Sequence, residues 1–268
     1  MRDGALQKPR FGSYELVRPL SAGPISERWL ACHEFDHTSH VVHYFPGRHD
    51  RAGQRRFLEA VETVAGLSHA HLLPIEQYAV CPSGRGVVVT PYTGNHAGLV
   101  SLDALLELKG GRMGPIEAKR AVTHLLEAID AASKVGGNGP VTLQQVLVDR
   151  HGRASIELYG LGARLRGASS VGPESERDEV RSVVEIGYRL VTGLSAEEPR
   201  VPVSKLETRL SPAWEAWLEA GLDPVGGYAS ALEAIAALGS GRDGEPASSA
   251  PGRVRVLLNR FRWPSRSR

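Results

Sequence analysis

Residues 146–160 of the chain read Val146-Leu147-Val148-Asp149-Arg150-His151-Gly152-Arg153-Ala154-Ser155-Ile156-Glu157-Leu158-Tyr159-Gly160. Two short apolar segments, 146–148 and 155–158, flank the turn-forming residues 149–152, and this pattern predicts a hairpin. Long patterns with helical spacing lie on both sides of the hairpin. A hairpin set between amphipathic helices indicates a mixed α+β chain.

The segments that lead up to the hairpin are rich in strand patterns. Strands are expected at 13–18, 26–32, 40–45 and 87–89, and one helix is expected around Phe57, Val61, Val64 and Ala65. The rest of the chain has three apolar stripes with helical spacing. The first consists of Ile116, Ala121, Val122, Leu125, Leu126 and Ile129, and the second of Val180, Val183, Val184, Gly187, Leu190 and Val191. The third consists of Leu232, Ile235, Ala236 and Leu238. The order predicts two lobes, a small β-rich N-lobe with one helix and a larger helical C-lobe.

Composition sets limits on the class of protein. The chain has 268 residues, of which 41% are hydrophobic, and this excludes collagen, a disulfide scaffold and general disorder. The two cysteines fit a reducing compartment, and no apolar run approaches about 18 residues, the length of a membrane-spanning helix. We therefore expect a cytoplasmic protein without a transmembrane segment.

The charge is unevenly distributed. Residues 253–268 contain six arginines and no acid, and removing these six charges from the net charge of +2 leaves the rest of the chain at −4. On a helix, Val254, Leu257, Leu258 and Phe261 would share one face, flanked by arginines. Such a segment suits binding to an anionic membrane surface, to a groove of a partner protein or to nucleic acid. Binding to the membrane surface would make the protein peripheral at the membrane. The alternative is a solvated, disordered tail. The expected units are an N-terminal tail (1–12), the N-lobe (13–92), the C-lobe (93–239), and a flexible linker with the basic tail (240–268).

Several local motifs, in this order over residues 12–239, resemble the eukaryotic-type (Hanks-type) serine/threonine protein kinase domain found in bacteria. Residues 14–20 are similar to its first strand, which leads into a Gly-rich loop, and 56–74 are similar to its helix C and the segment that follows. Residues 146–165 resemble the hairpin that runs into the D-F-G motif, and 186–193 resemble the end of its large central helix. The resemblance implies a two-lobed protein-kinase-like fold.

The residues that carry kinase chemistry depart from the pattern of this family. The Gly-rich loop G-x-G-x-x-G-x-V aligns with 21–28 and keeps only Gly23, while Pro24 lacks an amide donor. His43 stands in place of the phosphate-pairing lysine and Ala60 in place of the helix C glutamate; the neighbouring Glu59 is rotated by about 100° around the helix.

The catalytic loop and the metal site depart as well. The loop H-R-D-L-x-x-x-N aligns with 138–145, so that Pro140 replaces the base and Gln145 the metal-binding asparagine. D-F-G becomes Leu158-Tyr159-Gly160. Glu157 precedes it, and because side chains alternate along an extended chain, we expect Glu157 to face the opposite side. We assign no catalytic, cofactor-binding or metal-binding residue.

The resemblance thus implies a degenerate, catalytically inactive kinase-like domain, a pseudokinase, which acts as a protein-binding or regulatory module in signalling and has no cofactor. Its partner would be a protein, for which an active kinase is one candidate. The alternative is an atypical serine/threonine kinase that is active, or that binds ATP weakly or without a metal ion.

A third hypothesis comes from His33-Glu34-Phe35-Asp36-His37, which matches H-E-x-x-H and, extended to His43, has the spacing of a zinc peptidase. Here His33, His37 and His43 would bind zinc and Glu34 would activate water. The motif needs a helix, whereas its flanks have strand and turn character, so a histidine-rich surface hairpin is the simpler interpretation.

Overall fold

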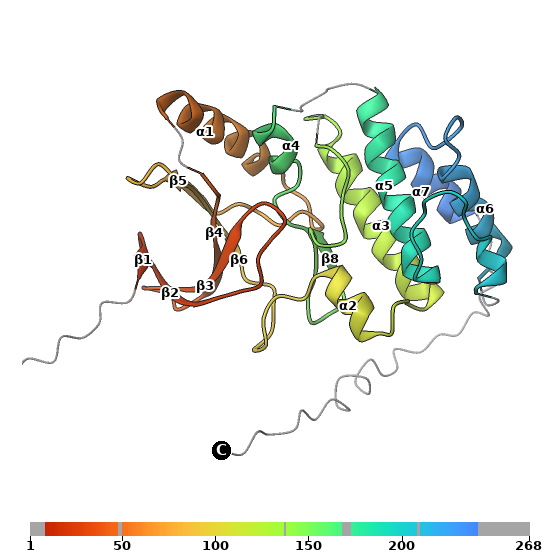
Figure 1. The fold of residues 1–268 in the computed structure, drawn as a ribbon, viewed down its shortest axis with the longest axis horizontal. Coiled ribbons are helices and arrows are strands. Elements are labelled where there is room, and N and C mark those ends of the chain that lie inside the picture. Colours follow the sequence, from red (N-terminus) through yellow and green to blue (C-terminus); the bar gives the residue numbers. More distant parts are fainter. Residues whose placement is uncertain (1–8, 48–49, 137, 168–172, 208–209, 241–268) are drawn as a thin grey trace, which may run out of the picture.

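The computed structural model describes residues 9–47, 50–136, 138–167, 173–207 and 210–240, which form two lobes (Figure 1). The N-lobe is built on an antiparallel six-stranded sheet of order β1-β2-β3-β4-β6-β5, with one helix. Its elements are β1 (Arg10–Phe11), β2 (Tyr14–Pro19), β3 (Glu27–His33), β4 (Ser39–Tyr44), α1 (Arg51–Ala65), β5 (Gln77–Val80) and β6 (Gly86–Pro91).

The C-lobe is helical, with a two-stranded hairpin at its border with the N-lobe. Its elements are α2 (Leu102–Leu108), α3 (Pro115–Ala132), β7 (Val146–Val148), β8 (Ala154–Ile156), α4 (Leu161–Leu165), α5 (Pro173–Thr192), the 3-10 turn η1 (Val203–Lys205), α6 (Pro212–Gly221) and α7 (Ala231–Ser240). The hairpin predicted from residues 146–158 is confirmed, with Val146 opposite Ile156.

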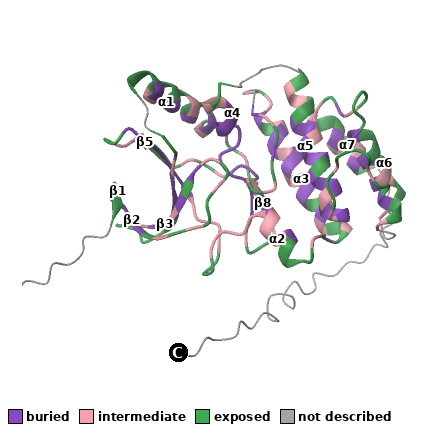
Figure 2. Cartoon of the chain, viewed as in Figure 1, coloured by how far each residue is buried: buried purple, intermediate pink, exposed green. Residues whose placement is uncertain are grey.

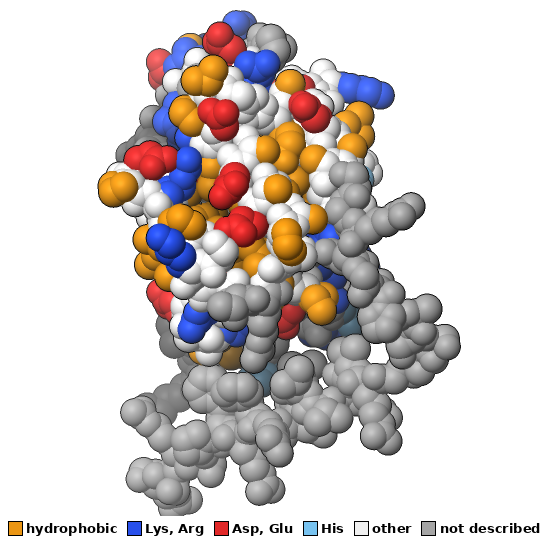
Figure 3. Space-filling model, turned by 90° about the vertical axis from the view of Figure 1, so that its right-hand side faces the viewer, with side chains coloured by type: hydrophobic (Ala, Val, Ile, Leu, Met, Phe, Trp, Pro, Cys, Tyr) orange, Lys and Arg blue, Asp and Glu red, His pale blue; other side chains and the backbone are white. Residues whose placement is uncertain are grey.

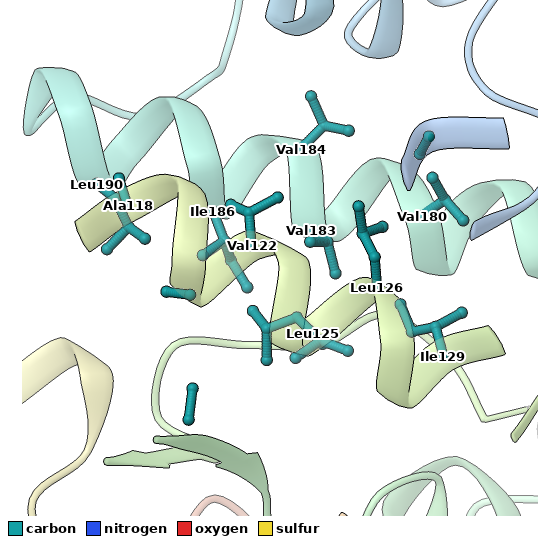
Figure 4. Packing of buried hydrophobic residues seen from close by; sticks show 14 of the residues in the cluster. Ala118, Val122, Leu125, Leu126, Ile129, Val180, Val183, Val184, Ile186 and Leu190 are labelled. Atoms are coloured by element: carbon teal, nitrogen blue, oxygen red, sulfur yellow. The ribbon is translucent and has the colours of Figure 1, made fainter. Parts of the chain in front are cut away.

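Buried apolar residues gather between the elements rather than on their outer sides (Figure 2). In the C-lobe, Val122, Leu125 and Leu126 of α3 meet Val180 and Val183 of α5 (Figure 4). Helix α3 lies beside α5 and α7 and carries the hairpin on its other side. The C-lobe core is therefore organised around α3, and the hairpin is held between this core and the N-lobe.

Two of the three predicted apolar stripes need correction. Ile116 is 86% exposed at the start of α3, and Leu232 is 61% exposed on α7. In α7 the buried positions are instead Ala231, Ala234 and Leu238. The prediction was wrong there because it followed the large side chains, whereas the small Ala231 and Ala234 are the buried residues of α7. The second stripe, on α5, is confirmed.

Some elements had no predicted counterpart. Strand β1 starts at Arg10, inside the segment expected to be a tail, and pairs with β2. Strand β5 and helix α2 were also missed, although Ser101 caps α2 by accepting a hydrogen bond from the backbone N–H of Ala104. The basic tail lies outside the described residues.

Candidate functional site between the two lobes

A buried ion pair joins the lobes. Arg28 of β3 donates from its Nη2 atom to Oε2 of Glu157, which follows β8, and each of these side chains is only 3% exposed. Burial raises the pKa of the Glu157 carboxyl, and the attraction of the Arg28 guanidinium opposes this rise. A charge on either side chain alone would be strongly unfavourable here, because the ion is removed from water. The pair therefore couples the N-lobe sheet to the end of the C-lobe hairpin.

His43 lies beside this pair. Since β3 and β4 are antiparallel and pair Arg28 with His43, both side chains project from the same face of the sheet. The His43 ring is completely buried, with Nδ1 at 3.1 Å from the Ser26 hydroxyl and Nε2 at 3.0 Å from the Thr90 hydroxyl. Burial and the Arg28 charge lower the pKa of His43 to about 3. A neutral histidine that is already hydrogen-bonded on both sides does not act as the cation expected at this position.

The loop between β2 and β3, residues 20–26, is folded onto its own strand and onto the C-lobe. The Gly23 amide donates to the Ser26 carbonyl over 2.8 Å, so this N–H is used within the loop. A Cβ atom at Gly23 would lie 2.8 Å from Nε of Arg28, and one at Gly162 of α4 would lie 3.1 Å from the Ile25 side chain. The loop therefore contacts both Arg28 and α4, and glycine at position 23 is required by the close approach of the guanidinium.

The residues at the D-F-G position divide between two environments. Leu158 is buried in an apolar cluster with Phe57 and Val61 of α1 and Leu161 of α4. Glu157 points instead between the lobes, where its Oε1 lies 3.6 Å from Nε2 of His43. Glu157 and Leu158 do face opposite sides, as expected from the sequence, but it is Glu157 and not Leu158 that lies between the lobes. Leu158 leaves the extended region, with φ of 48°, and Glu157 faces the arginine and histidine of the sheet.

The segment aligned with the catalytic loop is anchored to α5. The backbone N–H groups of Asn138 and Gly139 donate to Glu179 Oε1 over 2.9 and 3.0 Å, and the Tyr159 hydroxyl donates to Oε2 over 2.6 Å. Burial raises the pKa of Glu179, and the hydrogen bonds that it accepts oppose the rise. Glycine at 160, where φ is 77°, lets Asn138 pass within 2.5 Å of the position that a Cβ would occupy.

These positions do not fit a magnesium nucleotide. Gln145 uses Oε1 to accept hydrogen bonds from the backbone and hydroxyl of Thr142, within its own loop. Leu158 offers no oxygen, and the nearby carboxylate of Glu157 already neutralises Arg28. Glu59, next to the helix C position, is exposed and pairs with Arg55. The charged side chains that remain are therefore engaged with each other or with solvent.

Arg28 is the residue that the alignment with the Gly-rich motif should have singled out. It occupies the eighth position of G-x-G-x-x-G-x-V, where the motif has valine. An arginine in an otherwise apolar strand, Trp29-Leu30-Ala31, requires a buried acid as partner. This signal was present in the sequence, but it did not reveal that the acid is Glu157.

The H-E-x-x-H hypothesis does not have the geometry that it requires. His33 ends β3, His37 lies in the turn with φ of 57°, and His43 lies on β4 between the lobes. His33 hydrogen-bonds Asp36 over 2.9 Å, and Glu34 pairs with Arg10. Within the described ranges, no group of three histidine, cysteine or acidic side chains is arranged to hold a metal ion.

Two cavities lie away from the Arg28–Glu157 pair. One of about 380 Å³ lies along α5, between Val141, Arg189 and Arg200. The other, of about 280 Å³, lies between His69, Thr93 and Asp149 near the lobe border.

Among the helices that the structure describes, none combines the length and the apolar character needed to cross a bilayer.

A pH prediction follows from His43. The unfolded chain takes up a proton on this ring near pH 6.5, whereas the folded chain does so only near pH 3. Between these values the unfolded state binds more protons, so stability is lost as the pH falls. From pH 7.5 to 5.5 this histidine alone should cost about 1.4 kcal/mol. Urea unfolding of the wild type and His43→Gln at both pH values tests this: the variant should lose less stability, and equal losses would contradict the assignment.

Comparisons with known proteins agree with the two-lobed architecture. No protein-family model and no curated protein sequence matches the chain. Two crystal structures of the PknI kinase domain of Mycobacterium tuberculosis are similar in fold, with TM-scores of 0.67 and 0.66. They share 17% and 18% sequence identity with this chain, and the alignments cover 86% and 85% of it and 96% of each kinase domain. The chain has the protein-kinase fold, as the sequence motifs predicted.

Proposed function

We propose that this chain, which has a protein-kinase fold, is a catalytically inactive pseudokinase that serves as a protein-binding or regulatory module in signalling. The observation that carries the proposal is the buried Arg28–Glu157 pair beside neutral His43. Kinase chemistry needs a cation on the phosphates, carboxylates for the metal ions and a base for the substrate hydroxyl. In this chain the lysine, base and D-F-G positions hold His43, Pro140 and Leu158.

The pattern of retained contacts supports the same proposal. Groups that hold the local structure, rather than carry kinase chemistry, are present: Tyr159 and Gly160 form the turn after β8, and Glu179 fixes the loop at Asn138. The two lobes are joined by the Arg28–Glu157 pair and by the apolar cluster of α1 and α4. A fold whose lobes are joined by its own side chains can present a constant surface to a protein partner, for which an active kinase is one candidate.

A phosphotransfer assay tests this function. With labelled ATP, Mg²⁺ or Mn²⁺ and general protein substrates, the wild type should incorporate no more phosphate than His43→Ala, because His43 is neutral and Pro140 cannot act as the base, which alone contributes roughly 10² to 10⁴ in rate. Incorporation by the wild type that is lost in His43→Ala, with the variant still folded by circular dichroism, would instead establish the atypical kinase. A regulatory role is tested by adding the purified chain to a kinase that copurifies with it and measuring the phosphate transfer by that kinase.

A further inference from the structure

The outer surface of α6 and α7, here called the α6–α7 surface, combines acidic and apolar side chains. Residues 210–240 contain four acids and no lysine or arginine. Two apolar side chains lie in solvent on this segment, Val225 at 88% exposure and Leu232 at 61%. Figure 3 looks onto this end of the C-lobe and shows acidic, basic and hydrophobic groups interspersed on it. A segment that exposes acidic and apolar side chains together is suited to a basic, amphipathic partner.

Most acidic side chains of this surface have no basic side chain paired with them among the described residues. Glu215 accepts from the backbone of Ser204, and Glu233 accepts from the backbone of Ala229. In the part of the chain that the structure describes, Glu215, Glu219 and Glu233 form no salt bridge with a basic side chain. Asp223 differs, because Arg181 and Arg200 lie near enough to lower its pKa together with its backbone hydrogen bonds. Three uncompensated carboxylates remain.

The surface is also a firm platform. Trp217 of α6 donates from Nε1 to the carbonyl of Ala234 on α7 over 2.8 Å, and the Tyr228 hydroxyl donates to the Trp217 carbonyl over 3.1 Å. The rings of Trp217 and Tyr228 stack with centroids 5.8 Å apart. Because both helices are held from inside, a segment that binds their outer side does not need to order them first.

We propose that residues 253–263 of this same chain dock on the α6–α7 surface. This segment has the complementary chemistry: four arginines, no acid, and the apolar residues Val254, Leu257, Leu258 and Phe261. The arginines meet Glu215, Glu219 and Glu233, and the apolar side chains cover Val225 and Leu232. This inference concerns the tail and does not depend on whether the domain is a pseudokinase.

The length of the intervening chain permits this docking. Helix α7 ends at Ser240, so the residues 241–252 lie between it and the basic segment. Twelve residues reach at most about 40 Å and have a root-mean-square span of about 19 Å when flexible. A ten-residue helix is only about 15 Å long. A tether of this length gives an effective concentration of the order of millimolar, so that weak contacts suffice for docking.

Hydrogen exchange of the full-length chain, with charge reversal on each side, tests the proposal. The tail variant carries Arg253→Glu, Arg255→Glu, Arg260→Glu and Arg262→Glu, the surface variant carries Glu219→Lys and Glu233→Lys, and a third chain combines both sets. A control reverses exposed acids elsewhere, with Glu62→Lys and Glu107→Lys. Each reversal alone should speed exchange of α6 and α7 by about tenfold, as expected for loss of a contact held at ten times its dissociation constant. The combined chain should recover the slow exchange, and the control should not differ from the wild type.

Salt and concentration define the remaining outcomes. Raising NaCl from about 0.02 M to about 0.5 M should abolish the protection, because the contact is between exposed charges. Unchanged exchange in the tail variant would overturn the proposal. Protection that grows with protein concentration would assign the surface to a second copy and overturn docking within one chain. Binding of the tail to phosphatidylserine vesicles or RNA, with no tail-dependent protection of α6 and α7, would also overturn it.

Discussion

Replacing Arg28 by alanine is expected to lower the free energy of unfolding by about 3–5 kcal/mol, because Glu157 would remain buried without a counter-charge. Each side chain of the pair is 3% exposed, so solvent cannot take the place of the lost guanidinium. For a chain of this size the loss corresponds to a fall of roughly 10 °C in the melting temperature. Urea unfolding followed by tryptophan fluorescence measures it, with Trp29 adjacent to the site.

A double substitution separates the ion pair from packing. Glu157→Gln alone should also be destabilising, because it leaves a buried arginine charge, whereas Arg28→Met combined with Glu157→Met should cost far less than the two single changes together. Replacement of a whole buried pair by apolar residues is often neutral or stabilising. If each single variant lost less than about 1 kcal/mol, the range of an exposed salt bridge, the pair would not be a structural link between the lobes.

Replacing Glu179 by alanine is expected to lower the free energy of unfolding by about 3 kcal/mol. The carboxylate accepts hydrogen bonds from the N–H groups of Asn138 and Gly139 and from the Tyr159 hydroxyl. Each buried donor that is left unpaired costs about 1–3 kcal/mol, and relief of the burial of the carboxylate returns part of the sum. Thermal and urea unfolding give the magnitude.

Two variants calibrate this measurement. Tyr159→Phe removes only the hydroxyl and restores the phenylalanine of the D-F-G pattern, so it should cost about 1 kcal/mol. Glu107→Ala, on the exposed side of α2, should stay within about 0.5 kcal/mol of the wild type. A loss for Glu179→Ala as small as that for Glu107→Ala would mean that the loop at 138–145 does not depend on this anchor.

The sequence allowed the order of elements and the two lobes to be predicted, because period-2 and period-3.6 patterns report which faces are buried. It failed at Ile116 and Leu232, two large side chains that were assigned to the core and are exposed, whereas the small Ala231 and Ala234 are buried. Short elements such as β5 were missed since Gln77-Tyr78-Ala79-Val80 is partly exposed and lacks a strong alternation.

For the site, the sequence predicted only which charged groups of a kinase are missing. Local alignment identified His43, Pro140 and Leu158 at positions where charged groups would be needed, but local patterns cannot pair residues that are distant in sequence. Arg28 and Glu157 are 129 positions apart, and their contact depends on how the N-lobe sheet meets the hairpin. The left-handed Leu158 backbone, where the chain leaves the extended conformation directly after Glu157, was likewise not visible in an extended-strand pattern.

The most direct test of the proposal that the residues between the lobes hold no nucleotide is nucleotide binding by the wild-type chain. In a thermal-shift titration with up to about 5 mM ATP, with and without Mg²⁺, the melting temperature should change by less than about 1 °C, because a ligand stabilises a protein only by binding its folded state. Saturation at a hundred times the dissociation constant would add about 2.7 kcal/mol, or roughly 5–10 °C. A magnesium-dependent rise of that size, abolished by Glu157→Gln, would contradict the account.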